Sequence, residues 1–263
     1  MTAASNRTPT PSHLLMSTGK EVRIAVLDSG RNPAFPKLHA KNGSIFDCRI
    51  KLGTLKIEQL SDSENTDRCD HGSVVETCLR NVAPDAHIDH FRILDADCRC
   101  DGELLCSALE KVIQQGYQIV NLSLGTRNEK HLPRLVQILK DAYEKDVVLV
   151  ASASNLGASV YPAKFPYCIS TAATNARHPL ELRFTPRNVI EYAAWGVDVP
   201  IEGPNNEIFK VTGSSYAAAH ITALAARAWE VLGSTATPLD IKMFLRNYAL
   251  NTLTKYGSSH THH

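Results

Sequence analysis

Short apolar runs alternate with amphipathic helical patterns along most of the chain, and this alternation limits the possible folds more than any other feature. Apolar runs bounded by turn residues predict buried strands, and apolar residues spaced three and four apart predict helices between them. The predicted strands cover residues 22–27, 88–94, 119–124, 147–151 and 168–172, and the predicted helices cover residues 104–115, 132–145, 217–232 and 238–248. This order predicts a three-layer α/β/α fold with a mostly parallel central sheet and a site at the carboxyl ends of its strands.

The length and the hydrophobic content favour a single domain. The 263 residues are 43% hydrophobic, which is enough apolar material for one large core. Residues 1–20 are rich in Ser, Thr and Pro without a hydrophobic period, so we expect a flexible N-terminal arm before a domain at residues 21–250. Residues 251–263 end in a polar run and are expected to form a flexible tail.

Charge and hydropathy exclude two broad classes of partner. The 28 basic and 27 acidic side chains give a formal charge of +1, too small for a field that would hold nucleic acid or an anionic membrane. No run approaches the roughly 18 apolar residues of a membrane helix, and residues 1–20 lack the apolar centre of a secretory signal. A soluble, cytoplasmic protein is therefore predicted.

The cysteines are odd in number and scattered, which argues against a secreted disulfide framework and favours reduced thiols. Three of them form a cluster that could suggest zinc, but their spacing matches no recognised ligand pattern, and we expect no metal or cofactor. The seven are Cys48, Cys69, Cys78, Cys98, Cys100, Cys106 and Cys168, of which Cys98, Cys100 and Cys106 are clustered.

Three separate segments carry residue types that suit nucleophilic catalysis. Asp28 follows the first predicted strand, although an aspartate there can also cap a helix or bind a metal. His71 opens a predicted helix, where histidine is more often structural. Ser215 lies at the mouth of a buried helix, whose N-terminus favours the anion formed when a hydroxyl attacks a carbonyl. The alternative is that Ser214 or Ser215 merely caps this helix.

Together these segments give the chain order Asp, His, Ser, and the sequence resembles the subtilase family over residues 21–227. Further landmarks support the resemblance. They are Ile-Val-Asn-Leu-Ser-Leu-Gly at 119–125, Val-Leu-Val-Ala-Ser-Ala-Ser-Asn-Leu-Gly at 148–157, Tyr-Pro-Ala at 161–163 and Ala-Ala-Trp-Gly-Val-Asp-Val at 193–199.

The resemblance implies a subtilisin-like serine peptidase and a role for each residue. His71 would act as general base toward Ser215, while Asp28 holds the imidazole tautomer. Asn155 and the Ser215 backbone N–H would bind the oxyanion, and loss of one such donor costs about 3 kcal/mol. Asn155 could instead be an ordinary turn residue before Gly157.

An extended peptide substrate is expected to pair between two chain segments by main-chain hydrogen bonds. The first is Ser123, Leu124 and Gly125, and the second is Cys100, Asp101 and Gly102. The acidic side chains Asp95, Asp97 and Asp101 lie in or beside the second segment. They favour a basic substrate residue upstream of the cleaved bond, or they are simply a solvated acidic loop.

The sequence also departs from the family pattern. Ser73 and Ser214 replace threonine, Ala219 replaces proline, Ser154 replaces glycine, and Val74, Glu76 and Thr77 replace His, Ala and Gly. None removes a reacting atom, so we expect them to affect rate rather than reaction type, with Ser154 acting through the backbone at Asn155.

Two further expectations concern elements of secreted relatives. The chain runs from Leu79 through Ala83 and Pro84 without the insertion that holds calcium, and about twenty residues precede the first strand, too few for a folding propeptide. We therefore expect a selective intracellular endopeptidase, for instance one that removes a leader from a modified peptide precursor. The alternatives are a transamidase or macrocyclase and a catalytically weak subtilase that binds peptides; an intact triad without shielding insertions favours hydrolysis.

Overall fold

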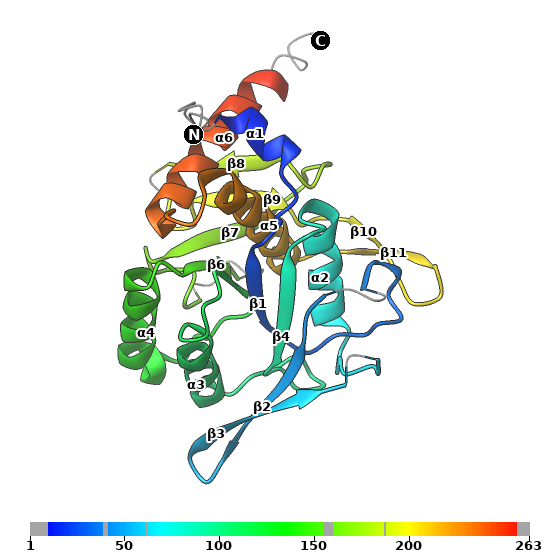
Figure 1. Cartoon of the computed structure of the whole chain (residues 1–263), viewed down its shortest axis with the longest axis vertical. Coiled ribbons are helices and arrows are strands. Elements are labelled where there is room, and N and C mark those ends of the chain that lie inside the picture. Colours follow the sequence, from blue (N-terminus) through cyan, green and yellow to red (C-terminus); the bar gives the residue numbers. More distant parts are fainter. Residues whose placement is uncertain (1–9, 39–41, 62, 155–159, 187, 257–263) are drawn as a thin grey trace, which may run out of the picture.

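The computed structural model describes residues 10–38, 42–61, 63–154, 160–186 and 188–256, and its centre is one nine-stranded sheet (Figure 1). The strand order is β3-β2-β4-β1-β5-β6-β7-β9-β8. All neighbouring pairs are parallel except β2–β3 and β8–β9 at the two edges. The strands are β1 (Arg23–Asp28), β2 (Ile45–Lys51), β3 (Thr54–Leu60), β4 (His87–Arg92), β5 (Ile119–Leu122), β6 (Val148–Ser152), β7 (Cys168–Thr174), β8 (Leu182–Phe184) and β9 (Tyr192–Trp195).

Helices cover both faces of this sheet, which confirms the predicted three-layer α/β/α fold. One buried cluster joins the sheet to α1, α2, α5 and α6, and a second joins it to α3 and α4. The helices are α1 (Pro11–Met16), α2 (His71–Val82), α3 (Gly102–Val112), α4 (Leu132–Glu144), α5 (Ser214–Leu232) and α6 (Pro238–Tyr256), with 3-10 turns at Pro36–Leu38 and Glu129–His131 and a separate pair of strands, β10 (Val199–Glu202) and β11 (Ile208–Val211).

The central strands are buried along their whole length because helices lie on both sides. Every residue of β5 and β6 is buried, as expected for continuous apolar runs in a parallel sheet. In α4 the buried residues are Leu135, Ile138, Leu139 and Ala142, the three- and four-residue spacing that predicted this helix. The same pattern brings the carboxyl ends of β1, β5 and β6 to one edge of the sheet.

The β2–β3 hairpin was not predicted. Its strands are joined at Leu52 and Gly53, which both have positive φ, 49° and 72°. Leu52 is fully exposed at this turn, where its left-handed backbone is unusual for a branched residue. The hairpin extends from the edge of the sheet in Figure 1, and its polar, half-exposed strand β3 lacks the apolar run that marked the central strands.

Helices occur within the segments expected as an N-terminal arm and a C-terminal tail. In the first, α1 buries Leu14 completely, and the Glu230 carboxylate accepts hydrogen bonds from the backbone N–H groups of residues 18, 19 and 20 at 2.7–3.0 Å. In the second, α6 continues to Tyr256, beyond the predicted helix end at residue 248.

The expectation that all cysteines are reduced is wrong for one pair. Cys69 and Cys98 form a disulfide between residues 29 apart in sequence, with Cα atoms 6.2 Å apart. The seven cysteines allowed up to three bridges, and only the fold shows which loops meet. Because the Cys98 sulfur is bonded to Cys69, the zinc alternative for the 98–106 cluster loses one of its ligands.

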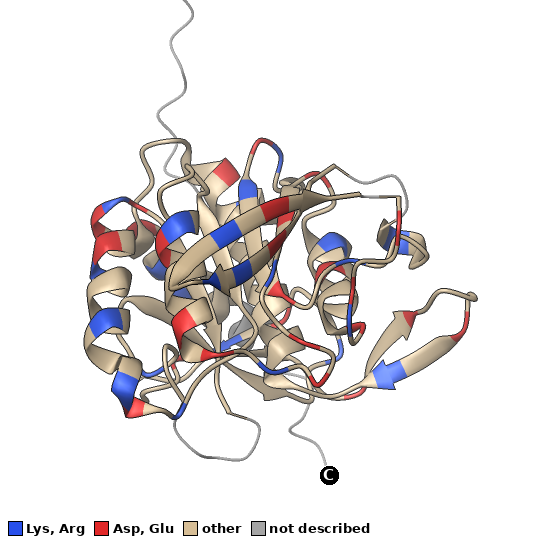
Figure 2. Cartoon of the chain, turned by 90° about the horizontal axis from the view of Figure 1, so that it is seen from below, with Lys and Arg blue, Asp and Glu red and all other residues tan. Residues whose placement is uncertain are grey.

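Of the helices in the described residues, none is long and apolar enough to cross a membrane. Basic and acidic residues are interleaved over the elements seen in Figure 2, in line with the balanced charge.

Candidate active site

Asp28 and His71 meet at the carboxyl end of β1. Asp28 is the last residue of β1 and is fully buried, and His71 is the first residue of α2. The Nδ1–H of His71 donates to Asp28 Oδ1 at 2.8 Å, and the Ser29 backbone N–H donates to the same oxygen at 2.8 Å. This contact fixes the imidazole ring with Nε2 free to accept a proton.

A second carboxylate, Asp67, is linked to this pair through the Ser29 hydroxyl. Ser29 Oγ donates to Asp67 Oδ1 at 2.6 Å and also lies 3.2 Å from Asp28 Oδ1. Asp67 Oδ2 accepts from the backbone N–H and the hydroxyl of Ser73 at 2.8 and 2.5 Å, which ties the loop before His71 to α2. The sequence analysis missed Asp67; its position four residues before the histidine was the available signal.

The environment raises the pKa of His71. Burial alone would lower that pKa, but the charge and hydrogen bond of Asp28 outweigh burial, and the charge of Asp67 adds to them. The imidazolium form is therefore stabilised, as a general base needs once it has taken a proton.

Ser215 lies in the first turn of α5, beside the end of β5. Ser215 Oγ donates to Ser123 O at 3.0 Å, and Ser123 Oγ donates to Ser215 O at 3.1 Å. The ring of the next residue, Tyr216, lies 5.8 Å from the His71 ring between centroids. Three segments distant in sequence therefore converge at one edge of the sheet.

The hydroxyls of Ser214 and Ser215 contact carbonyls beyond two strand ends. The residue before α5 is Gly213, and Ser214 Oγ donates to Ala153 O at 2.5 Å. Together with the bond from Ser215 Oγ to Ser123 O, this contact joins the start of α5 to the chain segments that continue β6 and β5.

Asn155 lies outside the described residues. The preceding Ser154 is described, and its hydroxyl accepts a hydrogen bond from Arg127 at 3.3 Å.

The two expected substrate-binding segments differ in conformation. Ser123 is buried, Leu124 is half-buried and Gly125 is exposed, where the chain continues beyond β5. Of the second segment, Cys100 is half-buried, but Asp101 caps α3 and Gly102 is already the first helical residue, in close contact with the His131 ring. The second segment therefore ends in a helix start and not in an extended edge, because Asp101 is followed by good helix-forming residues.

The three acidic residues beside this segment are exposed and partly used for local structure. Asp95 Oδ1 accepts from the backbone N–H groups of Asp97 and Arg99, and Asp101 Oδ1 accepts from that of Glu103. These bonds account for Asp95 and Asp101 as turn and cap residues, and the exposed Asp97 carboxylate remains beside the disulfide.

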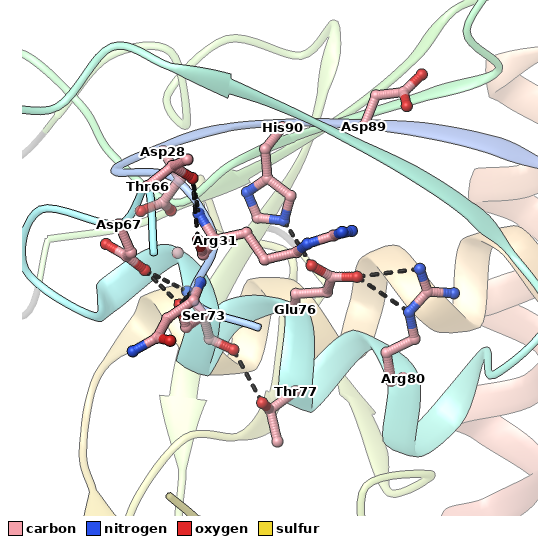
Figure 3. A network of polar contacts seen from close by, with 12 residues as sticks. Asp28, Arg31, Thr66, Asp67, Ser73, Glu76, Thr77, Arg80, Asp89 and His90 are labelled. Atoms are coloured by element: carbon pink, nitrogen blue, oxygen red, sulfur yellow. Dashed lines mark hydrogen bonds and ion pairs between the residues drawn. The ribbon is translucent and has the colours of Figure 1, made fainter. Parts of the chain in front are cut away.

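Behind the Asp28–His71 pair lies a buried charged network (Figure 3). Glu76 is fully buried; it accepts from Arg80 Nε and Nη2 at 3.1 and 3.0 Å, and its other oxygen contacts His90 Nε2 at 2.8 Å. Arg31, 2% exposed, lies beside Glu76 in Figure 3, and its Nε and Nη1 have no hydrogen-bond partner in the described part of the chain. Glu76, which replaces the alanine of the family pattern, was the sequence signal for this network.

Arg80 also joins three loop carbonyls. Nη1 donates to Ala86 O at 2.6 Å and Pro84 O at 3.3 Å, and Nη2 donates to Asn42 O at 2.9 Å. One guanidinium thus holds the end of α2 against the loops before β2 and β4. No group of three or more His, Cys, Asp or Glu side chains within the described ranges is placed to hold a metal ion.

A buried aspartate, a histidine bonded to it and a serine at a helix start beside a strand end are residue types that serine hydrolases use. The chain belongs to the subtilase family, because the model of that family matches residues 19–263.

Two proteins and two solved structures are similar to this chain. Subtilisin BL of Lederbergia lenta is 27% identical over 253 residues, covering 92% of this chain and 87% of that protein. The minor extracellular protease Epr of Bacillus subtilis is 28% identical over 219 residues, 79% of this chain but only 32% of Epr, so this chain spans about a third of that relative. The solved structures of S41 psychrophilic protease and sphericase have TM-scores of 0.69 and 0.68, at 24% and 22% identity, each covering 91% of this chain and 84% of the other, and they show the same fold.

Proposed function

We propose that this chain is a serine endopeptidase that hydrolyses peptide bonds through an acyl-enzyme on Ser215. The observation that carries the proposal is the 2.8 Å bond from His71 to the buried Asp28, at the sheet edge where the first turn of α5 presents Ser215. The subtilase family membership supports the same assignment.

The reaction would begin when the Ser215 hydroxyl hydrogen turns from Ser123 O to His71 Nε2. A hydroxyl has one hydrogen, so the bond to Ser123 O must be given up as Oγ attacks the carbonyl carbon. His71 takes that proton and then delivers it to the leaving amine, while Asp28 stabilises the imidazolium. Water repeats the sequence on the acyl-enzyme and releases the acid.

The negative oxygen of each tetrahedral intermediate needs donors on the side away from His71. The N-terminus of α5 offers the Ser215 backbone N–H and the positive end of the helix dipole. We assign the second donor to the Asn155 side chain, on the strength of its motif at the end of β6.

We further propose a selective processing role in the cytoplasm, with removal of a leader from a modified peptide precursor as one form of it. The exposed Asp97, close in sequence to the expected substrate-binding segment Cys100, Asp101 and Gly102, supports a preference for a basic substrate residue upstream. Peptides with Lys or Ala at successive upstream positions test this preference, and equal kcat/KM for both at every position would contradict it.

The Cys69–Cys98 disulfide counts against a reducing compartment. Alkylation of the protein at the moment of cell lysis tests the location: two blocked thiols at these positions support the cytoplasm, and an intact bridge contradicts it.

The decisive test is the intact mass after treatment with ethyl fluorophosphonate. Native protein should gain one adduct, and Ser215→Ala should gain none, with kcat toward a cleaved peptide reduced on the order of 10⁶-fold. The exposed Ser63→Ala is the matched control and should label like the native chain. Absence of an adduct on native protein would reject the enzyme and favour the catalytically weak, peptide-binding alternative.

If the adduct forms, product analysis separates hydrolysis from transamidation. Peptide cleavage in the presence of a free amine such as glycinamide should give the carboxylic acid as the main product. A dominant amide or cyclic product would assign the transamidase alternative.

A further inference from the structure

The β2–β3 hairpin has one apolar and one charged face. Side chains alternate between the two faces along a strand, and residues paired directly across two strands share a face. The apolar face packs on the core cluster that contains α3, through Cys48, Leu55 and Ile57. The charged face exposes one acidic side chain, Glu58, and basic side chains from both strands, namely Arg49, Lys51 and Lys56. Positive charge is therefore in excess on the exposed part of this face.

Three guanidinium groups converge on one buried carboxylate where this face meets the main sheet. Asp47 is 2% exposed, and its Oδ1 accepts from Arg92 Nε at 2.7 Å and from Arg68 Nη2 at 3.2 Å. Its Oδ2 is paired with Arg49 Nε. Burial alone would raise the pKa of Asp47, but the three arginines lower it, so the carboxylate is charged at neutral pH. One negative charge thus holds three positive charges in place and neutralises one of them.

Two of these arginines can be reached from solution. Arg49 is 53% exposed and Arg68 is 33% exposed, and within the described ranges the ion pair of each is with Asp47 alone. Burial and the charges of Arg92 and Arg49 lower the pKa of Arg68, although Asp47 opposes them. The guanidinium groups therefore repel one another. An anion placed over their outer side would relieve this repulsion.

One other carboxylate acts on the cluster. The charge of Asp95 raises the pKa of Arg68, but Asp95 forms no ion pair with it in the described part of the chain. Its Oδ1 instead accepts from the backbone N–H groups of Asp97 and Arg99. Asp95 therefore leaves the donors of Arg68 available to a ligand.

The cluster borders the loop that leads to His71. Arg92 Nη1 donates to Thr66 O at 2.8 Å, and Arg68 lies three residues before His71. Three residues of chain span at most about 11 Å, a distance that an extended peptide covers with a similar number of residues. A polypeptide bound beside His71 can therefore extend onto the cluster.

We propose that Arg49, Arg68 and Arg92 form an exosite, a binding site outside the reactive centre, for an acidic segment of the polypeptide substrate. Guanidinium groups bind carboxylates through paired N–H donors, and clusters of arginine recognise acidic motifs. Nucleic acid needs a broader basic surface than a chain of net charge +1 offers, so an acidic peptide fits better. The assignment of the occupant as substrate rests on the proposed function, because only a cleaved polypeptide would join the two sites.

A binding measurement that does not depend on cleavage tests the site. The probes are short rhodamine-labelled oligoglutamate and oligoglutamine peptides of equal length, and the readout is fluorescence anisotropy. At low ionic strength native protein should bind the oligoglutamate probe about 10-fold more tightly than the oligoglutamine probe. The difference should shrink at high ionic strength, because salt screens exposed charges.

Two variants then assign the binding to the cluster. Arg49→Gln should weaken oligoglutamate binding about 5-fold, since one exposed ion pair is lost. The matched control is the exposed Arg177→Gln, which removes the same charge between β7 and β8 and should bind like native protein. A melting curve verifies the fold of each variant. Arg68→Gln replaces R49Q in the comparison if R49Q does not fold.

Cleavage identifies the occupant. A peptide that the protein cleaves is extended at either end with oligoglutamate or with oligoglutamine, and kcat/KM is compared within each pair. At one of the two ends the acidic extension should raise kcat/KM about 10-fold over its neutral partner in native protein and in R177Q. In R49Q the same ratio should fall to about 2-fold.

Equal affinity of native protein for both probes, or equal oligoglutamate affinity of R49Q and R177Q, would overturn the exosite. Tighter, Arg49-dependent binding of a short oligothymidylate would assign the cluster to nucleic acid and overturn the acidic-peptide occupant. Equal kcat/KM within both peptide pairs would overturn the assignment to substrate. Arg49-dependent oligoglutamate binding by a protein that cleaves no peptide and gains no fluorophosphonate adduct would instead reject the proposed function, and the substrate assignment with it.

Discussion

The Asp28–His71 half of the site and the Ser215 half are built in different ways. The first half depends on directional polar contacts: Asp28 and Glu76 are fully buried carboxylates, each held by histidine, arginine or serine. The second half is α5, whose buried face is mainly alanine, with His220 as its titratable residue; burial lowers the pKa of His220 to about 4. Polar contacts fix side-chain direction but are costly to break and respond to pH, whereas small apolar residues allow close packing with small losses per residue.

The largest stability effect is expected from Glu76→Ala. It would leave Arg80 and Arg31 buried without their acidic neighbour, which costs about 3–5 kcal/mol of unfolding free energy. Urea unfolding at pH 7 measures this loss. The exposed Glu58→Ala on β3 is the control, with a change within about 0.5 kcal/mol. A loss under about 1 kcal/mol for E76A would show that the network does not hold this half together.

The pH dependence of that difference adds a second check. Burial alone would raise the pKa of Glu76, but the hydrogen bond from His90 and the charges of His90, Arg80 and Arg31 lower it below 4.5. A depressed carboxyl pKa contributes stability that is complete above the unfolded value of 4.5 and is lost as the pH falls through the folded value. The E76A difference should therefore shrink only in that acid range.

The next effect concerns the disulfide beside His71. Removing the Cys69–Cys98 bridge by a double serine substitution should cost about 3–4 kcal/mol, given the 29-residue separation that the bridge closes. Dithiothreitol should destabilise native protein by a similar amount and leave the double variant unchanged. Equal unfolding curves for native protein with and without reductant would contradict the prediction.

A smaller effect is expected in the Ser215 half. Ala225→Gly in the buried part of α5 should cost about 1–2 kcal/mol, from helix propensity and one lost methyl group. Because no charge changes, the loss should be the same at pH 6 and pH 8, both well above the His220 pKa of about 4. A loss that varied with pH would remove the contrast between the two halves.

The smallest effect is a shift in pH dependence after Asp67→Asn. The charge of Asp67 helps raise the pKa of His71, so its removal should lower that pKa and move the acid limb of the fluorophosphonate labelling rate to lower pH. The exposed Asp146→Asn should leave the limb in place. A limb that moves to higher pH in D67N would contradict the role of Asp67.

Elements with strong periodicity were predictable and edge elements were not. Strands β1, β4, β5, β6 and β7 and helices α3, α4 and α5 lie within a few residues of their predicted ranges, since burial on both faces requires unbroken apolar runs. The β2–β3 hairpin and α1 are short or half-exposed, so their sequences carry little periodic signal.

The site residues that stand in short sequence motifs were predictable, whereas the pairs formed only by tertiary contact were not. Asp28, His71 and Ser215 stand in short motifs, and the structure brings their segments together. The Cys69–Cys98 disulfide and the antiparallel bridge between Thr126 and Tyr161 join loops whose approach depends on the whole fold. Local sequence cannot specify such pairs.

The Arg80 guanidinium affects the conditions under which the end of α2 stays bound to the loops before β2 and β4. It gathers carbonyls from Asn42, Pro84 and Ala86 around a positive charge, as a bound cation would. A cation that is covalently part of the chain cannot dissociate or be removed by a chelator. The positive charge that binds these three carbonyls therefore does not depend on the ions in the surrounding medium.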